Sequence, residues 1–279
     1  METNRAVETN RADARGSVVL LERDPADDAV AIVTLNRPDR RNALTVEVKN
    51  ALLEVLRQVA EDSTVRAVVL TGQGKTFCVG QDLGEHAAAL AADPARAFET
   101  VEEHYNPIVR SLTEMPKPVV GAVNGAAVGA GLGFALACDL RVAAEGAPFA
   151  TAFAAIGLTA DSGLSASLVH SLGASRATEL MLLGESFSAE QARDWGLVRA
   201  VVPAEQVRDA ALELARRLAA GPTAAYAEIK KALATGASSP LETVLVAEGQ
   251  AQARLGLTAD HQGAVQAFLA KRRPNFTGS

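Results

Sequence analysis

Apolar and polar positions alternate along this chain in two patterns, one typical of strands and one typical of helices. Residues 18–22 and 29–35 are short apolar runs, and they predict two strands joined by a polar turn over 24–28. A helix follows, because apolar residues then recur at the spacing of one helix face. These residues are Val48, Leu52, Val55, Leu56 and Val59. The chain therefore begins with a strand, strand, helix unit.

The same unit recurs more loosely further along the chain. Apolar runs predict strands at 66–71, 117–123 and 139–144, and longer stretches predict helices around 95–113 and 130–138. Repetition of strand, strand and helix predicts an α/β spiral. The alanine-rich segment 84–93 carries weak signals, and we expect it to be mobile.

From about residue 204 the pattern is helical and predicts no further strand. One amphipathic face consists of Val207, Ala210, Ala211, Leu214 and Leu218. Ser239 and Glu242 form a capping-box pattern around Pro240, which predicts a helix beginning at 240, and Ser188 with Gln191 predicts a shorter helix in the same way. Such helices must bury their apolar faces on the spiral or on a neighbouring subunit.

These patterns divide the chain into three parts. Residues 1–16 contain a polar segment in which Glu2–Ala6 is repeated as Glu8–Ala12, and we expect this tail to be disordered. Residues 17–203 form the spiral core and residues 204–279 the helical region. A chain of 279 residues is long enough to bury one large core.

Composition excludes several classes of function. The net charge of −6 argues against general affinity for nucleic acid. No apolar run is long enough to span a membrane and no secretion leader precedes the core, so we expect a cytoplasmic protein. Cys78 and Cys138 are isolated, which is typical of small buried residues. The four histidines lack the spacing of metal ligands, and no metal is expected.

Two glycine-rich turns carry the strongest functional signal. Phe77–Asp82 and Asn124–Phe134 each follow a strand-like run, and the second opens an apolar helix. Backbone N–H groups at a helix start have no partner within the helix and bind anions. A second N–H near Gly80 can converge on the same point and hold an oxygen that becomes negative during reaction. Together the turns predict an oxyanion hole.

Two more familiar glycine motifs do not fit these segments. The segment Gly72–Thr76 ends like a phosphate loop, but Val69 stands where that motif requires glycine. Gly129, Gly131 and Gly133 are spaced two apart, which does not match the dinucleotide fingerprint. Glycines that only permit tight turns and close helix packing remain an alternative.

Three motifs in this order and spacing resemble the crotonase (enoyl-CoA hydratase/isomerase) superfamily. They are TLNRPDRRNAL at 34–44, FCVGQD at 77–82 and NGAAVGAGLGFALACD at 124–139. Within that superfamily the chain looks most similar to the 1,2-epoxyphenylacetyl-CoA isomerases of phenylacetate breakdown, because of LTADSG at 158–163 and the ending FLAKRRPNFTGS. The resemblance implies an α/β fold, a crotonase-like ββα superhelix with a C-terminal helical trimerisation region.

The resemblance also implies the ligand and the residues that hold it. The substrate is an acyl-CoA thioester whose carbonyl oxygen accepts hydrogen bonds from the N–H groups of Gln81 and Ala130. Coenzyme A enters with the substrate, so no separate cofactor is expected, and the partner is a second copy of the chain in a homotrimer or a dimer of trimers. The implied substrate-binding residues are Arg37, Arg41, Ala43, Gly80, Asp82, Leu83, Gly129, Phe153, Phe268 and Lys271.

Two of these residue groups are also compatible with purely structural roles. Arg37, Arg40 and Arg41 form a basic cluster that can meet a phosphate, or can be a solvated turn. Phe268 and Lys271 resemble residues that a neighbouring subunit lends to the CoA site, or can belong to a helix end whose dipole favours cations. Asp82 and Asp139 are suited to anchoring backbone N–H groups near the turns, and we expect Glu85 to be solvated.

The acid/base residue decides the reaction. By the motif alignment, the two glutamates of hydratases fall on Gly133 and Phe153, neither of which can carry a proton. Asp161 instead stands at the position that resembles the catalytic aspartate of the isomerases, although it could merely cap the helix near Gly163. A single carboxylate suits a proton shift that moves a double bond or opens a ring epoxide. The alternatives are an atypical hydratase and a non-catalytic acyl-CoA-binding protein.

Overall fold

Two sheets form the centre of the protein. The computed structural model describes residues 16–279, so the tail expected at 1–16 lies outside the described residues except for Gly16. The first sheet has the strand order β1-β2-β3-β5-β7-β10 and the second β4-β6-β8-β9. The strands are β1 (Val19–Asp24), β2 (Asp27–Leu35), β3 (Ala67–Gly72), β4 (Thr76–Cys78), β5 (Val119–Val123), β6 (Ala126–Val128), β7 (Leu140–Ala144), β8 (Pro148–Ala150), β9 (Phe187–Ser188) and β10 (Ala200–Val202).

The connections between the sheets make a spiral. β1 and β2 form an antiparallel hairpin, while β2, β3, β5, β7 and β10 are parallel. After β3, β5 and β7 the chain crosses to β4, β6 and β8, which pair in parallel in the second sheet. Each coil therefore contributes one strand to each sheet. The predicted α/β spiral is confirmed.

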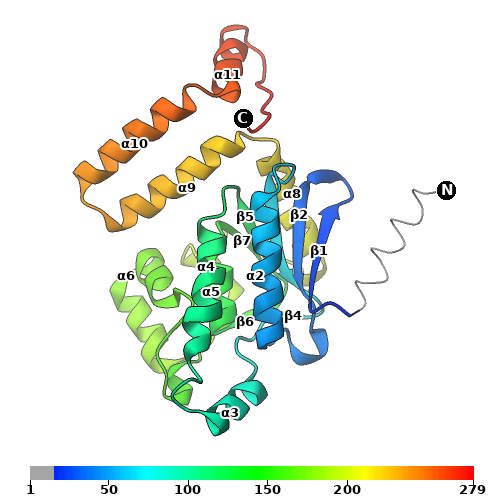
Figure 1. Ribbon diagram of the computed structural model, residues 1–279, viewed down its shortest axis with the longest axis vertical. Coiled ribbons are helices and arrows are strands. Elements are labelled where there is room, and N and C mark those ends of the chain that lie inside the picture. The colour runs from blue at the N-terminus through cyan, green and yellow to red at the C-terminus, as the bar shows by residue number, and fades with distance from the viewer. Residues whose placement is uncertain (1–15) are drawn as a thin grey trace, which may run out of the picture.

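Helices cover the sheets and extend beyond them. They are α2 (Val46–Glu61), α3 (Leu83–Ala92), a π-helical turn (Val101–Tyr105), α4 (Asn106–Thr113), α5 (Ala130–Ala137), α6 (Leu164–Leu183), α7 (Ala189–Asp194), α8 (Val207–Ala219), α9 (Thr223–Ser238), α10 (Leu241–Leu255) and α11 (Ala259–Leu269). Short 3₁₀ turns span Pro38–Arg40, Ala154–Ile156 and Ala204–Gln206. Figure 1 shows α2, α4 and α5 side by side against the strands, and α8 contacts β2, β3, β5 and β7.

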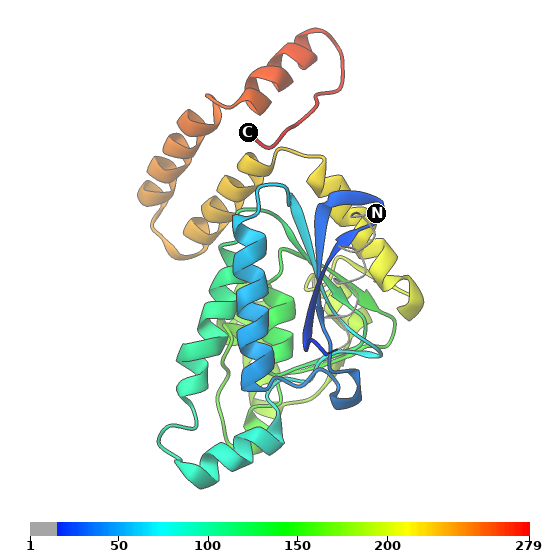
Figure 2. The same ribbon diagram turned by 45° about the vertical axis from the view of Figure 1, so that its right-hand side comes forward.

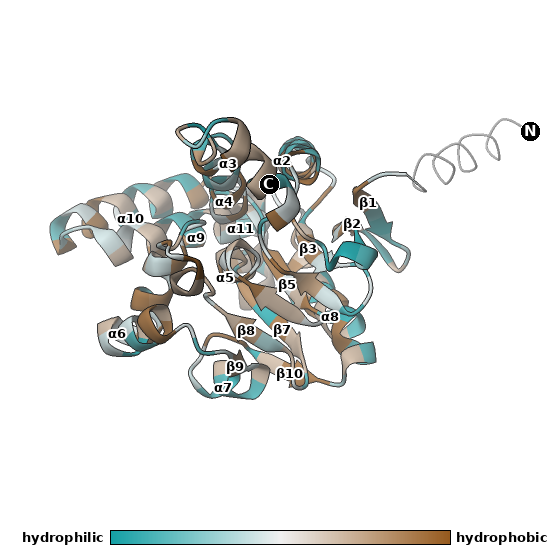
Figure 3. Ribbon diagram, turned by 90° about the horizontal axis from the view of Figure 1, so that it is seen from below, coloured by the Kyte–Doolittle hydropathy of each residue, from teal (hydrophilic) through white to brown (hydrophobic). Residues whose placement is uncertain are grey.

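The apolar patterns predicted the packing of α2 well and that of α8 in part. In α2, Val48, Leu52, Leu56 and Val59 are buried, as expected for one helix face. In α8 the buried face contains Val207, Ala211, Leu212, Ala215 and Ala219, while Ala210, Leu214 and Leu218 are half-buried at its edge. Seen from below in Figure 3, hydrophobic colour covers the central strand β5 and much of the edge strand β10.

Two segments differ from their local sequence signals. Residues 84–92 lie in α3 although their signals are weak, because the Asp82 side chain accepts hydrogen bonds from the Gly84 and Glu85 N–H groups and caps the helix, and the expected mobility of this segment stays a prediction. Ser239 caps no helix: α10 begins at Leu241 after Pro240, and no side-chain cap is formed. The predicted capping box of Ser188 and Gln191 is confirmed at the start of α7.

The last three helices form an arm that leans away from the spiral (Figure 2). Within residues 16–279, α9 and α10 contribute no buried residue. Apolar side chains that stay exposed on the arm are Ile229, Leu233, Leu241, Leu245, Val246, Leu257, Val265, Phe268 and Leu269. Arg66 ties the arm to β3, because its guanidinium donates to the Gly221 and Phe276 carbonyls. Among the described helices, none is long and apolar enough to cross a membrane.

Candidate active site

The two glycine-rich turns lie against one another. An added Cβ at Gly80 would lie 3.0 Å from the Val128 carbonyl oxygen and 3.4 Å from the Ala130 nitrogen, and one at Gly131 would collide with the Cys78 carbonyl. Gly80 also has a positive φ of 80°, which favours glycine. Glycine is therefore required where the turns touch, both for the backbone conformation and for the close approach.

Two backbone donors are available where the turns meet. Ala130 is the first residue of α5, so its N–H has no acceptor within the helix. No hydrogen bond in residues 16–279 uses the Gln81 N–H, although its neighbours Gly80 and Asp82 both bond to Leu44. Gln81 and Ala130 line the same cavity. These are the two donors that the family resemblance implies, and their role as an oxyanion hole stays a prediction.

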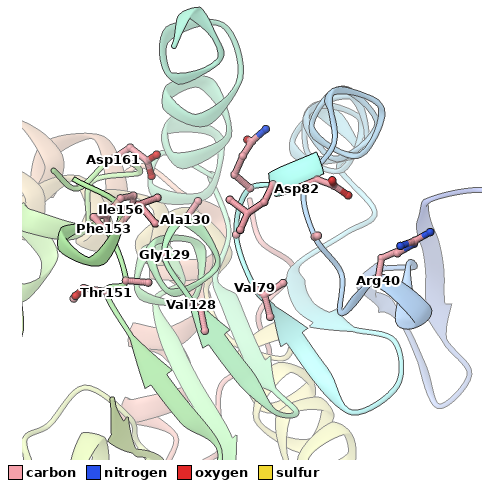
Figure 4. A pocket seen from close by; sticks show the side chains of 15 residues that line it. Arg40, Val79, Asp82, Val128, Gly129, Ala130, Thr151, Phe153, Ile156 and Asp161 are labelled. Atoms are coloured by element: carbon pink, nitrogen blue, oxygen red, sulfur yellow. The ribbon is translucent and has the colours of Figure 1, made fainter. Parts of the chain in front are cut away.

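The cavity beside these donors is large enough for a small-molecule group. Its volume is about 360 Å³, within the usual range of ligand pockets. Gly80, Asp82, Leu83, Ala43 and Gly129 line it, together with Val79, Val128, Thr151, Ala152, Ile156, Phe153 and Asp161. In Figure 4, Asp161, Phe153 and Ile156 lie at one side of this cavity, Arg40 at the other, and Gly129, Ala130 and Val79 between them.

The basic cluster is arranged differently from the prediction. Arg37 has a structural role, because its Nη1 donates hydrogen bonds to the Ala43 carbonyl at 2.7 Å and to Asp82 Oδ2 at 3.1 Å. Arg41 is exposed and does not line the cavity, whereas Arg40 does. The turn at Pro38–Arg40 directs its one arginine, Arg40, towards the site, and the sequence alone does not determine that direction.

Asp82 has a structural role beside the cavity. Burial would raise the pKa of this carboxyl group, but the hydrogen bond from Arg37 and those from the Glu85 and Gly84 N–H groups outweigh it and leave the pKa below its usual value. Asp139 likewise anchors backbone, accepting from the Val119 N–H at 2.7 Å and from Lys230 at 2.9 Å. Both anchoring predictions are confirmed. Glu85 is not simply solvated, because its carboxylate accepts from the Val46 N–H at 3.0 Å.

Asp161 brings a carboxylate to the acyl side of the cavity. Burial raises its pKa, an effect opposed by the hydrogen bond that Ser162 Oγ donates to Asp161 Oδ1 at 2.8 Å and by the charge of Lys49. The capping alternative is wrong, because the cap residue of α6 is Gly163 and it forms no side-chain cap bond. Ser162 does not cap the helix either. Asp161 is thus a partly desolvated carboxylate with raised basicity.

A second, smaller cavity continues from Asp161. It measures about 70 Å³ and is lined mostly by apolar and aromatic side chains. They are Leu83, His86, Phe98, Val101, Tyr105, Phe153, Ile156 and Leu158, with Gln81 and Thr100. Asp161 therefore stands between the donor pair and an apolar recess, which can accept a hydrocarbon chain or ring.

Neither hydratase position offers a carboxylate. Phe153 lines both cavities with an aromatic ring that cannot transfer a proton. Gly133 lies in α5, where an added Cβ would be 2.6 Å from Ser162 Cβ and 2.9 Å from the Ser162 carbonyl oxygen. A longer side chain at position 133 has no room while Ser162 stays in place.

Sequence reasoning missed two residues behind the donor pair. Lys49 on α2 is fully buried, and its Nζ donates to Gln81 Oε1 at 3.2 Å and to Thr100 Oγ1 at 2.6 Å. Tyr105 is also buried, and its hydroxyl donates to the same Gln81 oxygen. A signal existed: Lys49 stands three and four residues before Leu52 and Leu53, on the apolar face of its helix.

Phe268 and Lys271 do not reach the cavity of their own chain. Phe268 is 80% exposed, Lys271 is exposed, and α11 lies at the opposite end of the molecule from α3 in Figure 1. Within residues 16–279, no group of three or more His, Cys, Asp or Glu side chains is arranged to hold a metal ion.

Comparison with known proteins agrees with this geometry. A family model described as enoyl-CoA hydratase/isomerase matches residues 26–279. The chain is 43% identical to the 1,2-epoxyphenylacetyl-CoA isomerase of Escherichia coli, covering 90% of this chain and 96% of that protein. It is 42% identical to a Rhodobacter capsulatus protein described as an enoyl-CoA hydratase, covering 90% of this chain and 95% of that one.

Solved structures show the same fold. A crystal structure from Mycobacterium abscessus, described as an enoyl-CoA hydratase/isomerase, superposes with a TM-score of 0.88 at 51% identity, covering 94% of this chain and all of that one. An enoyl-CoA hydratase from Bacillus anthracis gives a TM-score of 0.86 at 32% identity, covering 94% of this chain and 100% of that chain.

Proposed function

The chain belongs to the enoyl-CoA hydratase/isomerase family, and we propose that it is an isomerase of acyl-CoA thioesters in which Asp161 moves the proton. The substrate class we propose is a 3-enoyl-CoA, a ring epoxide of phenylacetyl-CoA, or both. One observation carries the proposal. Asp161 shares a cavity with the Gln81 and Ala130 donors, whereas Gly133 and Phe153 supply no second carboxylate.

The mechanism is a proton shift through an enolate. The thioester carbonyl oxygen accepts hydrogen bonds from the N–H groups of Gln81 and Ala130. The Asp161 carboxylate takes a proton from the carbon next to the carbonyl, and the electron pair of the broken C–H bond moves into the carbonyl as an oxyanion. Each preorganised donor stabilises that anion by about 2.7–4 kcal/mol. In a 3-enoyl thioester the charge spreads over the double bond, and Asp161 returns the proton two carbons away.

Ring opening uses the same groups. In an epoxide of an aromatic acyl-CoA, the thioester again becomes an enolate when Asp161 removes the proton from the carbon next to the carbonyl. The electron pair of the enolate then forms a double bond between that carbon and the ring, and the adjacent C–O bond of the epoxide breaks with its own electron pair left on the oxygen. Protonated Asp161 can return its proton to this oxygen, so that the product is an isomer of the substrate. The apolar recess lined by Phe98, Tyr105, Phe153 and Leu158 suits the ring or chain of the acyl group.

The opposite side of the cavity suits coenzyme A. Arg40 lies there, away from Asp161, and its guanidinium can pair with a phosphate. We propose that the remaining CoA contacts come from a neighbouring subunit of a homotrimer, or of a dimer of trimers, through Phe268 and Lys271. The exposed apolar side chains of the arm support an assembly that covers them.

A substrate panel tests the proposal. Purified protein is incubated with a 3-enoyl-CoA, a 2-enoyl-CoA and an aromatic acyl-CoA, and each reaction is followed by mass-resolved chromatography and ultraviolet absorbance. We expect isomerisation without the gain in mass that addition of a water molecule would give, and a loss of about 10²–10⁴-fold in kcat/KM for Asp161→Asn with CoA-ester binding retained. An Asp161→Asn variant that keeps more than about a tenth of kcat/KM would end the assignment.

Hydration is the second candidate, because several relatives, including the one from Rhodobacter capsulatus, are described as hydratases. The same panel separates the two reactions, since hydration adds water to the product. Binding of CoA esters with no product in any reaction would favour the non-catalytic alternative.

A further inference from the structure

Lys49 is a buried cation. It lies on the buried face of α2, in the first turn of that helix, and is 0% exposed. Within residues 16–279, none of the side-chain carboxylates is within 4.0 Å of its Nζ. Burying a charge in this way costs free energy, and a buried lysine persists only where another benefit offsets that cost. Lys49 lies directly behind the donor pair, which suggests that the benefit concerns the donor pair.

The contacts of Lys49 converge on Gln81. Gln81 Oε1 accepts two hydrogen bonds, one from Lys49 Nζ and one from the Tyr105 hydroxyl. The Lys49 ammonium also lies 5.1 Å from the centre of the Tyr105 ring, which is a favourable cation–π geometry. Thr100 Oγ1 accepts from Lys49 as well and contacts His104 Nδ1 at 3.1 Å. Gln81 is thus fixed at its side chain by groups from two other segments.

We propose that Lys49 is a positioning residue for the oxyanion hole: together with Tyr105 it holds the Gln81 side chain so that the Gln81 N–H stays directed at the thioester oxygen, and its charge favours the anions that form in the cavity. This inference rests on the proposed function of that cavity. The positioning role and the charge effect can be tested separately, because Tyr105 also donates a hydrogen bond to Gln81 but carries no charge.

The charge acts on Asp161 across Gln81. Lys49 lowers the pKa of Asp161, opposing the larger effect of burial, while burial lowers the pKa of Lys49 itself. Lys49 also lines a third cavity, of about 170 Å³, and other titratable groups face this cavity from α3 and from the segment before α4. They are Glu85, His86, Arg96, Glu99, Glu103 and His104. Burial, followed by the charge of Lys49, lowers the pKa of His104 and favours its neutral form.

A spectroscopic measurement tests the proposal without turnover. A conjugated aromatic acyl-CoA with no removable proton next to its carbonyl absorbs at longer wavelength when hydrogen bonds polarise that carbonyl. We expect a red shift on binding to the unmodified protein, and a smaller shift at saturating ligand for both Lys49→Met and Tyr105→Phe. Lys117→Met is the matched control, because Lys117 is also buried and donates to the Val59 and Asp62 carbonyls at the far end of α2.

Kinetics then separate position from charge. With a 3-enoyl-CoA we expect kcat to fall about 10- to 100-fold in Lys49→Met and Tyr105→Phe with little change in KM, as for a small misplacement of a reacting group. Lys49→Met alone should also move the acid limb of the pH profile of kcat/KM to higher pH. This variant removes the positive charge that favours the ionised form of Asp161, whereas Tyr105→Phe does not.

The outcomes are distinct. A full red shift and an unmoved acid limb in folded Lys49→Met would overturn the inference, as would an equal loss in Lys117→Met. If Lys49→Met does not fold, an undiminished red shift in Tyr105→Phe overturns the positioning role, and a diminished one supports it. No red shift with the unmodified protein would overturn the oxyanion hole itself, and the inference with it.

Discussion

Gly133 and Ser162 are packed so closely that a Cβ atom added to Gly133 would lie 2.6 Å from the Cβ of Ser162. Ser162 is buried and also donates to Asp161, so it cannot easily move away. From the sequence alone, we expect glutamates placed at Gly133 and Phe153 to restore hydration if the site tolerates them. The packing contradicts that expectation at Gly133. Close packing between α5 and Ser162, the residue next to Asp161, therefore excludes a carboxylate side chain at position 133.

Gly133→Ala should therefore be destabilising even though alanine is the better helix former. We expect overpacking of roughly 1–3 kcal/mol, measured as a lower Tm and a lower denaturant midpoint. Gly263→Ala is the matched control, because Gly263 lies in α11 with open space around its Cβ position, and it should not be destabilised. Equal stability of Gly133→Ala and the unmodified protein would show that Ser162 can move aside to accommodate a Cβ atom at position 133.

Ser162→Ala should change the pH dependence of the reaction. The Ser162 hydroxyl lowers the pKa of Asp161, so its removal leaves burial less opposed and the pKa rises further. Because the ionised carboxylate is the base, the acid limb of kcat/KM should move to higher pH. Ser165→Ala, at an exposed position in the first turn of the following helix α6, serves as control. An unmoved limb in Ser162→Ala would contradict Asp161 as the titrating base.

Asp161→Asn should stabilise the fold at neutral pH. Burial raises the pKa of Asp161 in the folded protein, above the value of about 3.9 in an unfolded chain. The folded state therefore binds the proton more tightly, and ionisation of Asp161 costs stability as pH rises through the folded pKa. Asparagine lacks that cost. The Tm advantage of the variant should be present at about pH 7–8, shrink as the pH falls through the folded pKa of Asp161, and be lost below about pH 4, where both states are protonated.

The control for this measurement is Asp28→Asn, which removes an exposed carboxylate. Its Tm difference should vary little with pH. A Tm advantage of Asp161→Asn that is the same at every pH would mean that the gain comes from packing and not from the buried charge.

Lys271→Ala should weaken binding of whole CoA esters if the neighbouring subunit lends this residue to the site. The loss should shrink as salt rises, because an exposed lysine and a phosphate attract each other electrostatically. A truncated pantetheine thioester, which lacks the nucleotide, should bind almost as before. Isothermal titration with both ligands at two salt concentrations measures this directly.

Arg272→Ala, at the adjacent basic residue, is the control for this prediction. Equal losses for the two ligands in Lys271→Ala would indicate a defect in folding or assembly. No loss with either ligand would confine Lys271 to its own helix end.

Local sequence pattern determined most of the spiral. Runs of apolar residues predicted β1, β2, β3, β5 and β7 of the large sheet to within a few residues, because a strand buried on both faces requires continuous apolar side chains. The short edge strand β10 was not predicted. The short second-sheet strands β4, β6 and β8 carried no such signal, since three residues show no periodicity. Ser239 shows the limit of local motifs. The helix begins at Leu241, one residue after the predicted start, but the Ser239 side chain does not cap it.

The resemblance to the crotonase superfamily, and not a local pattern, pointed to Asp161 as the candidate base. The sequence by itself determined the two glycine turns and the helix start that leaves the Ala130 N–H without a partner in its helix. Those features depend on residues close together in the chain. The tertiary structure alone decided that Arg37 braces Asp82 while Arg40 faces the cavity, that Ser162 fills the space beside Gly133, and that Lys49 lies buried behind Gln81. Each of these contacts joins segments that are far apart in the sequence or fixes a direction in space. Spacing along one segment contains neither kind of information.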